Sequence, residues 1–262
     1  MRIAVAATAA FGADVLERLA AEHDIAYLLT RPDAPRGRGR KLAPPPAKEA
    51  AERLGIALHQ PERPELLDAA VDAIVVCAYG LLIPETLLAR TLWLNVHPSL
   101  LPRWRGAAPV ERAILAGDTR TGVTIHETVK ALDAGPIAAQ EAFPIGPADD
   151  AGVVFARAAE VAVRLLGNVL AAPSFAPQPE EGTTYAEKLG PADRALRLDE
   201  PVDADRRVRA LSPHIGAWAN LYGRRVTIWQ GRLEGGRFVP VLVQPEGRRR
   251  MDYEEFLRGM RE

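Results

Sequence analysis

The stretch Leu94–Pro109, with the sequence LNVHPSLLPRWRGAAP, predicts the fold and the site more strongly than any other part of the chain. Residues 93–96 are apolar and β-prone and are followed by Pro98, which predicts a buried strand that ends at the edge of a sheet. Asn95 and His97 lie two residues apart, so on a strand both side chains point to the same face. Open α/β sheets bind ligands at the carboxyl ends of their strands, where we expect these two side chains.

The residues after this strand predict a loop, because Pro98, Pro102, Gly106 and Pro109 can continue neither a strand nor a helix. Such a loop can present backbone groups to a small molecule. Taken alone, Asn-x-His also fits an ordinary hydrogen-bonded strand end, and the loop also fits a turn that leads into a helix. A third polar group is needed to favour a catalytic site over this structural alternative.

Asp133 supplies that third group. It lies in the small-residue turn 131–136, between two strand-like segments at 122–127 and 137–144. An amide, an imidazole and a carboxylate on loops of one sheet can together stabilise an oxyanion and manage one proton. We therefore predict a catalytic set of Asn95, His97 and Asp133.

The composition is that of an ordinary globular protein: 262 residues, 48% hydrophobic and 26% charged, with a net charge of −1. Any affinity for nucleic acid must therefore come from a local patch. The single cysteine, Cys77, lies in the apolar segment 73–78, which predicts a buried thiol and excludes a disulfide within the chain. No apolar run is long enough to span a bilayer, and the first predicted strand follows Met1 directly, so we expect a cytoplasmic protein without a signal peptide.

The start of the chain predicts a β-α-β unit and hence a parallel sheet. Strands at 2–6 and 25–29 flank an apolar-periodic helix at 12–21. The loop between the first strand and the helix, residues 6–12, contains a single glycine and so lacks the glycine fingerprint of dinucleotide-binding folds. A nicotinamide or flavin cofactor is therefore disfavoured.

Residues 30–46 differ in character from the rest of the chain. Their five basic side chains lie among prolines and glycines, with Asp33 as the only acid: Arg31, Arg36, Arg38, Arg40 and Lys41. This composition is too rich in helix breakers for a helix and predicts a long, exposed, mobile loop. A solvated surface loop is the plain interpretation, but its length within a compact domain raises the chance that it binds a polyanion.

The remaining pattern predicts a larger domain, residues 1–179, and a small C-terminal domain, residues 180–262. In the larger domain we expect helices at 48–54, 109–116 and 150–170, and a strand at 72–78 that runs into an apolar loop at 79–84. Three prolines in Pro173–Pro179 predict a linker. In the smaller domain we expect a hairpin of 224–233 with 238–244 and a helix at 252–261, and ten arginines between residues 206 and 250 make this part moderately basic. No spacing typical of metal ligands is present.

These motifs resemble those of the tetrahydrofolate-dependent formyltransferases, and more narrowly those of the methionyl-tRNA formyltransferases. The catalytic segments at 95–109, 121–124 and 132–136 mark the wider superfamily. The basic loop at 31–42 and the tail at 243–251 narrow the resemblance to the tRNA enzymes. Residues 76–84 are also similar to a segment of those enzymes, so that the resemblance covers nearly the whole chain.

The resemblance implies a Rossmann-like, mostly parallel sheet with helices on both faces, followed by a β-rich, OB-like domain. This C-terminal domain is shorter than the family's between Gln230 and Val241, which predicts an incomplete barrel and weaker tRNA binding. The loop after the first strand also lacks the family's glycine-containing sequence. In the family this loop is expected to contact the acceptor end of the tRNA, so the contacts there should differ in this chain.

The resemblance also implies the reaction: transfer of a formyl group from the co-substrate 10-formyltetrahydrofolate to the α-amino group of methionine on initiator tRNA. Folate contacts are implied for Ser99, Leu100, Leu101, Pro102, Tyr79, Gly80, Leu81 and Leu82. Contacts to tRNA are implied for Arg36, Arg38, Arg40 and Lys41. We expect a monomer that uses no metal and binds no membrane.

Three alternatives stay open at this point. A formyltransferase acting on an amino sugar nucleotide would use the same catalytic set without a need for the basic loop. A formyltetrahydrofolate hydrolase would use water in place of the amine and would also lack that need. A catalytically idle RNA-binding protein is disfavoured because the complete catalytic set is present.

Overall fold

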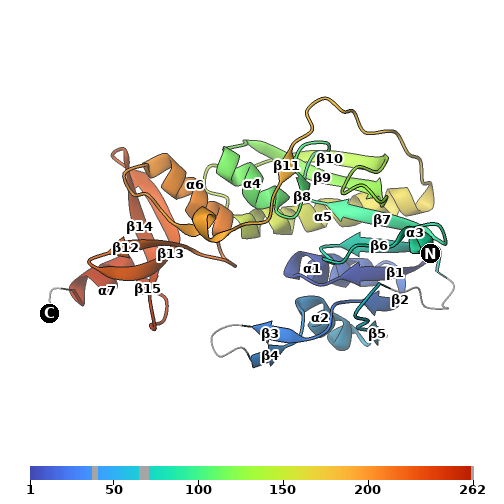
Figure 1. The fold of residues 1–262 in the computed structure, drawn as a ribbon, viewed down its shortest axis with the longest axis horizontal. Coiled ribbons are helices and arrows are strands. Elements are labelled where there is room, and N and C mark those ends of the chain that lie inside the picture. Colours follow the sequence, from blue (N-terminus) through green and yellow to red (C-terminus); the bar gives the residue numbers. More distant parts are fainter. Residues whose placement is uncertain (37–40, 65–70, 261–262) are drawn as a thin grey trace. The chain divides into compact units, whose positions relative to one another are not determined.

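The computed structural model describes residues 1–36, 41–64 and 71–260, and the chain divides into two compact units (Figure 1). The first unit comprises Met1–Arg105, Gly122–Ala142 and Ala156–Thr184, and the second comprises Gly106–Thr121, Phe143–Phe155 and Tyr185–Glu262. Each unit is therefore assembled from separate segments of the sequence. The predicted domain boundary after residue 179 falls in the last segment of the first unit and stays a prediction.

A seven-stranded sheet with the order β10-β9-β7-β6-β1-β2-β5 carries the predicted site. Its strands are β1 (Arg2–Ala7), β2 (Asp24–Leu29), β5 (Leu58–His59), β6 (Ala73–Cys77), β7 (Leu92–His97), β9 (Arg120–Glu127) and β10 (Ile137–Pro144). The pairs from β5 to β7 are parallel, and β9 is antiparallel to β7. β1 and β6 are almost wholly buried, as expected for strands covered on both faces. The prediction of a mostly parallel, Rossmann-like sheet is confirmed.

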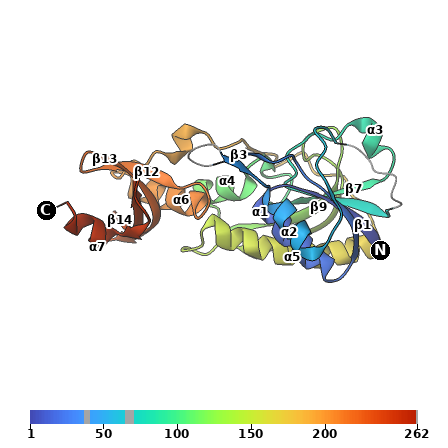
Figure 2. The ribbon, with the colours of Figure 1, turned by 90° about the horizontal axis from the view of Figure 1, so that it is seen from below.

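Helices cover both faces of this sheet. They are α1 (Ala10–Ala20), α2 (Pro46–Leu54), α3 (Glu85–Leu88) and α5 (Ala151–Ala171), and α1 and α2 lie side by side (Figure 2). Helix α1 contacts β1 and β6. The contact is so close at Gly12 that a Cβ there would collide with the carbonyl oxygen of Cys77. On the other face, Leu87 and Leu88 of α3 pack against a core that includes Tyr27 and Trp93. Cys77 is fully buried as predicted, and burial raises the pKa of its thiol well above the usual range.

The second unit combines helices with a four-stranded antiparallel sheet. Its elements are α4 (Pro109–Ala116), the 3₁₀ helix η1 (Pro191–Arg194), α6 (Pro201–Leu211), β12 (Ala217–Leu221), β13 (Arg224–Glu234), β14 (Arg237–Pro245), β15 (Met251–Asp252) and α7 (Tyr253–Arg258). Helix α6 packs against both α4 and β13. Its apolar face joins alternate residues of β12 and β13, such as Ala219 and Ile228, in one core. The predicted β-rich C-terminal region with its hairpin is confirmed, and its last helix ends three residues earlier than predicted.

The segment 30–46 is more regular than predicted. Strands β3 (Ala34–Arg36) and β4 (Lys41–Ala43) pair with each other in antiparallel register, so the expectation of a loop was wrong for these residues. At the base of this pair, Lys48 Nζ lies 2.9 Å from the Asp33 carboxylate, and the amide of Gln60 donates to the same group over 2.8 Å. These two contacts hold the pKa of Asp33 below its usual value.

The predicted linker, Pro173–Pro179, lies in the last segment of the first unit, shortly before the second unit resumes at Tyr185. Ala176 and Ile137 exchange two backbone hydrogen bonds of 2.7 and 2.9 Å, which fix this segment beside the start of β10 within the first unit. A short pairing of β8 (Arg105–Gly106) with β11 (Tyr185–Ala186) follows. Proline-rich composition therefore marks an extended segment here, and its hydrogen bonds hold it in place.

None of the helices among the described residues is long and apolar enough to cross a bilayer.

Candidate active site

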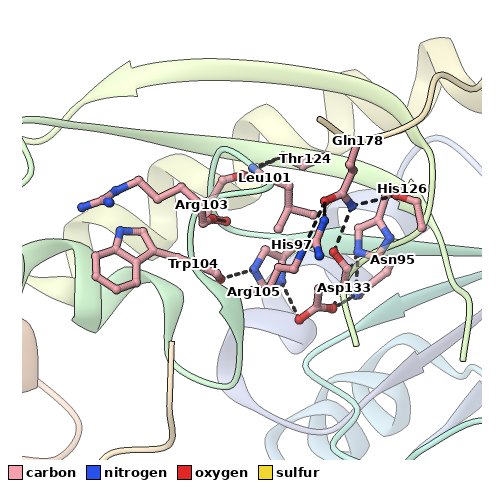
Figure 3. Close-up of polar contacts among 12 residues, drawn as sticks. Asn95, His97, Leu101, Arg103, Trp104, Arg105, Thr124, His126, Asp133 and Gln178 are labelled. Carbon is pink, nitrogen blue, oxygen red and sulfur yellow. Dashed lines mark hydrogen bonds and ion pairs between the residues drawn. The ribbon is translucent and has the colours of Figure 1, made fainter. Parts of the chain in front are cut away.

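The site lies at the carboxyl end of β7, where the parallel part of the sheet meets the antiparallel strand β9. Asn95 and His97 lie among the last three residues of β7, two positions apart on the same strand, as predicted. The register of the two strands places His126 opposite Asn95 and Thr124 opposite His97. Asp133 follows β9 in the turn that leads to β10, and Figure 3 shows its carboxylate between the side chains of Asn95 and His97. The structure therefore brings the three predicted residues together.

Asn95 is held by two partners at once. Its Nδ2 donates to Oδ1 of Asp133 over 2.9 Å and lies 3.1 Å from Nε2 of His126. The other ring nitrogen of His126, Nδ1, lies 2.8 Å from the backbone oxygen of Glu127, which can only accept. His126 therefore carries its hydrogen on Nδ1 and accepts from Asn95 through Nε2. Both hydrogens of the Asn95 amide are engaged in this arrangement.

His97 is buried, and its Nε2 lies 2.8 Å from the backbone oxygen of Trp104. Because that oxygen only accepts, Nε2 carries a hydrogen and Nδ1 faces Oδ2 of Asp133 at 3.6 Å. Burial lowers the pKa of His97, while the Asp133 carboxylate and the Trp104 carbonyl act in the opposite direction. The net direction is downward, which favours a neutral imidazole near pH 7.

The turn that carries Asp133 is conformationally demanding. Asp133 has a φ of 48°, in the left-handed region that non-glycine residues rarely adopt. Two residues later, a Cβ on Gly135 would collide with the backbone oxygen of Glu127, so that only glycine allows the turn to approach β9 this closely. Left-handed residues of this kind gather at functional sites when the surrounding structure holds them in place.

The loop after β7 is packed and hydrogen-bonded to the neighbouring strands. The hydroxyl of Thr124 donates to the backbone oxygen of Ser99 over 2.7 Å and accepts from the backbone N–H of Leu101. Ser99 and Leu101 are buried, and Leu100 lies against Gly122. The predicted folate contacts at Ser99–Pro102 therefore lie directly beside His97, and their role stays a prediction.

The loop after β6 lies at the same sheet edge, because β6 and β7 are parallel neighbours. Tyr79 is buried in the core of the sheet, and its backbone oxygen accepts a hydrogen bond of 2.8 Å from Thr8. Leu81 packs against the same core, whereas Leu82 is 82% exposed. Of the second set of predicted folate contacts, Gly80 and Leu82 thus face outward and Tyr79 is buried; their role stays a prediction.

The predicted tRNA contacts are only partly visible. Arg36 ends β3, and Lys41 begins β4 with an exposed side chain. Arg38 and Arg40 lie outside the described residues. Arg31 connects this region with the site edge, since its side chain comes within 3.9 Å of the position that a Cβ on Gly80 would take.

Two residues of the site were not found from the sequence. His126 could have been identified from its register opposite Asn95, but that register becomes visible only once β9 is known to pair with β7. Gln178 hydrogen-bonds to the turn of Asp133, and the sequence offers no local pattern for this contact. Among the residues that the structure describes, no group of side chains is arranged to hold a metal ion.

The sequence matches the family model described as formyl transferase over residues 1–170, which include Asn95, His97, His126 and Asp133. The chain belongs to the formyl transferase family. A methionyl-tRNA formyltransferase from Cereibacter sphaeroides is 38% identical over 290 aligned positions, which cover 99% of this chain and 96% of that protein. The family resemblance found in the motifs is thus confirmed over nearly the full length.

Solved structures agree on the fold. The methionyl-tRNA formyltransferase from Clostridium thermocellum has a TM-score of 0.66 at 15% identity, covering 94% of this chain and 98% of that one. An N-formyltransferase from Helicobacter canadensis, solved with folinic acid and dTDP-3-aminofucose, has a TM-score of 0.65 at 16% identity and covers 88% of both chains. Because the two scores are nearly equal, the fold alone does not distinguish a tRNA substrate from a sugar substrate.

Proposed function

We propose that this protein transfers the formyl group of 10-formyltetrahydrofolate to the α-amine of methionine on initiator tRNA. The observation that carries this proposal is the 38% identity to a methionyl-tRNA formyltransferase over nearly both full chains, together with the meeting of Asn95, His97 and Asp133 at one sheet edge. In the reaction, the amine nitrogen bonds to the formyl carbon and the bond from that carbon to the donor nitrogen breaks. The amine loses one proton, and the donor nitrogen gains one.

Asp133 accepts the amine proton in this proposal. Its Oδ2 is 3.6 Å from Nδ1 of His97, so a proton taken up by the carboxylate lies beside an imidazole nitrogen that can share it. The N–H of Asn95 on Oδ1 fixes the direction of the carboxylate. A carboxylate that is oriented by an amide and flanked by a neutral imidazole is suited to move one proton without a metal ion.

The formyl oxygen gains negative charge as the amine attacks, and Asn95 and His97 are the proposed donors to it. Both side chains already donate their hydrogens, Asn95 to Asp133 and His126, and His97 to Trp104. To donate to the formyl oxygen, each side chain must therefore share one of these hydrogen bonds with it or give one up. Protonation of Asp133 weakens its hold on Asn95 and so favours that exchange at the moment when the charge develops.

The loops after β6 and β7 are the proposed folate contacts. Together they offer backbone groups next to an apolar surface, with Leu82 exposed and Leu101 buried beside His97. A planar ring with hydrogen-bonding edges, such as a pterin, suits this combination. Bound there, the folate supplies the activated formyl carbon, while the chain holds both substrates together and lowers the entropic part of the barrier.

The basic segment and the C-terminal sheet are the proposed tRNA contacts. Arg31, Arg36 and Lys41 lie in or beside the β3–β4 pair. On the C-terminal sheet, the guanidinium of Arg225 lies 4.2 Å from the ring centre of Trp218, and that of Arg250 lies 3.6 Å from Trp229. Arginines braced on aromatic rings suit the recognition of phosphates. The expected monomer and cytoplasmic location stay predictions.

A single assay tests the proposal against its two alternatives. The purified protein is incubated with 10-formyltetrahydrofolate and with charged initiator tRNA, with a nucleotide-linked amino sugar, or with neither acceptor. We expect formyl-methionyl-tRNA as the main product. Faster formylation of the sugar would identify a sugar enzyme, and rapid release of formate without any acceptor would identify a hydrolase.

A further inference from the structure

Gln178 is the one residue of the segment 171–180 that is not exposed. The segment runs along the first unit, where the backbone of Ala176 pairs with Ile137. Two residues after that pairing, the Gln178 side chain points toward the turn of Asp133 (Figure 3). An inward-facing amide in an otherwise exposed stretch must have partners for its polar atoms, or its burial would cost free energy.

The Gln178 amide has four such partners, two on each end. Its Nε2 donates to the backbone oxygens of Asp133 over 2.9 Å and of Gly135 over 2.7 Å. Its Oε1 accepts from Nε and from the second terminal nitrogen of Arg105, over 3.1 and 2.6 Å. The side chain therefore uses all of its hydrogen-bonding capacity in one place.

One end of the amide contacts Asp133, a neighbour of the His97 ring, and the other contacts Arg105, the residue after the second neighbour, Trp104. On the donor side, Gln178 holds the carbonyls that flank Ala134, and so fixes the left-handed turn that aims the Asp133 carboxylate at Nδ1 of His97. On the acceptor side it holds Arg105, which directly follows Trp104. Trp104 has a φ of 65°, and its backbone oxygen receives the Nε2 hydrogen of His97.

We propose that Gln178 is a positioning residue for formyl transfer, one that fixes the Asp133 turn and the Trp104–Arg105 loop relative to His97. It touches no reacting atom in this arrangement and acts through the groups that do. This inference rests on the proposed catalytic roles of His97 and Asp133. It assigns a function to a segment that its composition marks only as a linker.

The first test is Gln178→Ala, with Glu181→Ala as the matched control because Glu181 is an exposed residue directly after this segment. Loss of the amide lets the carboxylate and the carbonyl drift by a fraction of an ångström. We expect kcat to fall by about 10- to 100-fold while the KM values for both substrates change by less than about threefold, as for a misplaced catalytic group. The control should match the wild type.

The second test is Gln178→Glu, which separates positioning from simple filling of space. The glutamate has the same length and can still accept from Arg105, but it places an oxygen against the carbonyls of Asp133 and Gly135. A space-filling role predicts near-normal activity, whereas positioning predicts a kcat at or below that of Gln178→Ala. The ¹⁵N shifts of the His97 ring, recorded in both variants, should move from their wild-type values.

A wild-type kcat in both Gln178 variants would overturn the proposal. So would a fall in kcat that follows a matching loss of thermal stability, with unchanged His97 shifts in the folded protein. If Gln178→Ala does not fold, Arg105→Ala tests the acceptor side of the same contact and should lower kcat without raising KM. If the wild type turns out to prefer another acceptor, the variants are assayed with that acceptor, so that failure of the proposed function and failure of the Gln178 proposal are distinguished.

Discussion

Nε2 of His97 lies 2.8 Å from the backbone oxygen of Trp104, a residue only seven positions further along the chain. The loop between them thus returns to the strand it has just left and determines which ring nitrogen carries the hydrogen. With Nε2 engaged, Nδ1 is the nitrogen presented to Asp133. The geometry of this one loop therefore decides how a proton can pass between His97 and the carboxylate.

Replacing Asp133 with asparagine should nearly abolish turnover. The amide preserves the shape but cannot accept the amine proton, so we expect kcat to fall by about 10²- to 10⁴-fold. Folate binding, measured by isothermal titration calorimetry, should stay close to that of the wild type. Loss of the carboxylate should also lower the pKa of His97 further, since the charge of Asp133 acts to raise it. Near-normal turnover in this variant would exclude Asp133 as the base.

Stability should depend on pH through His97. Burial lowers the folded-state pKa of this residue below its unfolded value of about 6.5, so the unfolded chain binds the proton more tightly. The corresponding stabilisation is complete above about pH 6.5 and is lost as the pH falls toward the folded-state pKa. Urea unfolding between pH 5 and 7.5 should show this loss in the wild type and a smaller one in His97→Gln. Equal slopes for both proteins would contradict the lowered pKa.

Gly135→Ala and Gly167→Ala should change stability in opposite directions. At position 135 a methyl group would collide with the Glu127 carbonyl, and we expect a loss of about 1–3 kcal/mol together with impaired catalysis. At position 167, within α5, the same methyl group meets no atom within 4 Å. There alanine should stabilise the helix by up to about 1 kcal/mol. Thermal unfolding of both variants provides the measurement.

Removing the charges of Arg36, Arg38, Arg40 and Lys41 should weaken tRNA binding and flatten its dependence on salt. Each lost phosphate contact lowers the slope of log K against log salt by about 0.7–0.9. Matched controls are Arg53→Ala and Arg164→Ala, because these arginines already pair with Glu17 and Glu141. An unchanged salt slope in the fourfold variant would return the segment to the role of an ordinary surface loop.

Arg225→Gln and Arg250→Gln should each weaken tRNA binding and lower the salt slope by up to about one. Both guanidiniums lie over tryptophan rings on the C-terminal sheet. Arg232→Gln is the control, since Arg232 on the same sheet already pairs with Glu234 at 3.1 Å. Formylation of a small amine should be unaffected in all three. Point variants are preferable to deletion of the C-terminal region, because deletion would remove α6 from its packing against α4.

The sequence predicted the parts of the site that depend on local order. Asn95 and His97 share one strand, and period-two alternation alone places them on one face. Spacing could not place Asp133, because it lies 38 residues after Asn95 in the sequence. The pairing of β9 with β7 brings it to the site. Asp133 was predicted from its chemistry, because a carboxylate complements the amide of Asn95 and the imidazole of His97.

The parts that were missed depend on contacts that leave no local trace. His126 lies within a strand of mixed polar and apolar residues, and only the antiparallel register places it opposite Asn95. Gln178 stands among prolines, so composition suggested a linker, whereas its neighbour Ala176 is hydrogen-bonded to β10. The β3–β4 pair was missed for a similar reason, since prolines and glycines mark the ends and turns of strands as readily as loops.

The interleaving of the two units has a consequence for synthesis on the ribosome. A nascent chain that has emerged as far as residue 184 contains every segment of the first unit, but only 106–121 and 143–155 of the second. Helix α4 is then present with its apolar residues Val110 and Ile114, while its partner α6 has yet to appear. The proposed catalytic residues are thus all present well before translation ends, whereas the apolar face of α4 is covered only once the last third of the chain has been made.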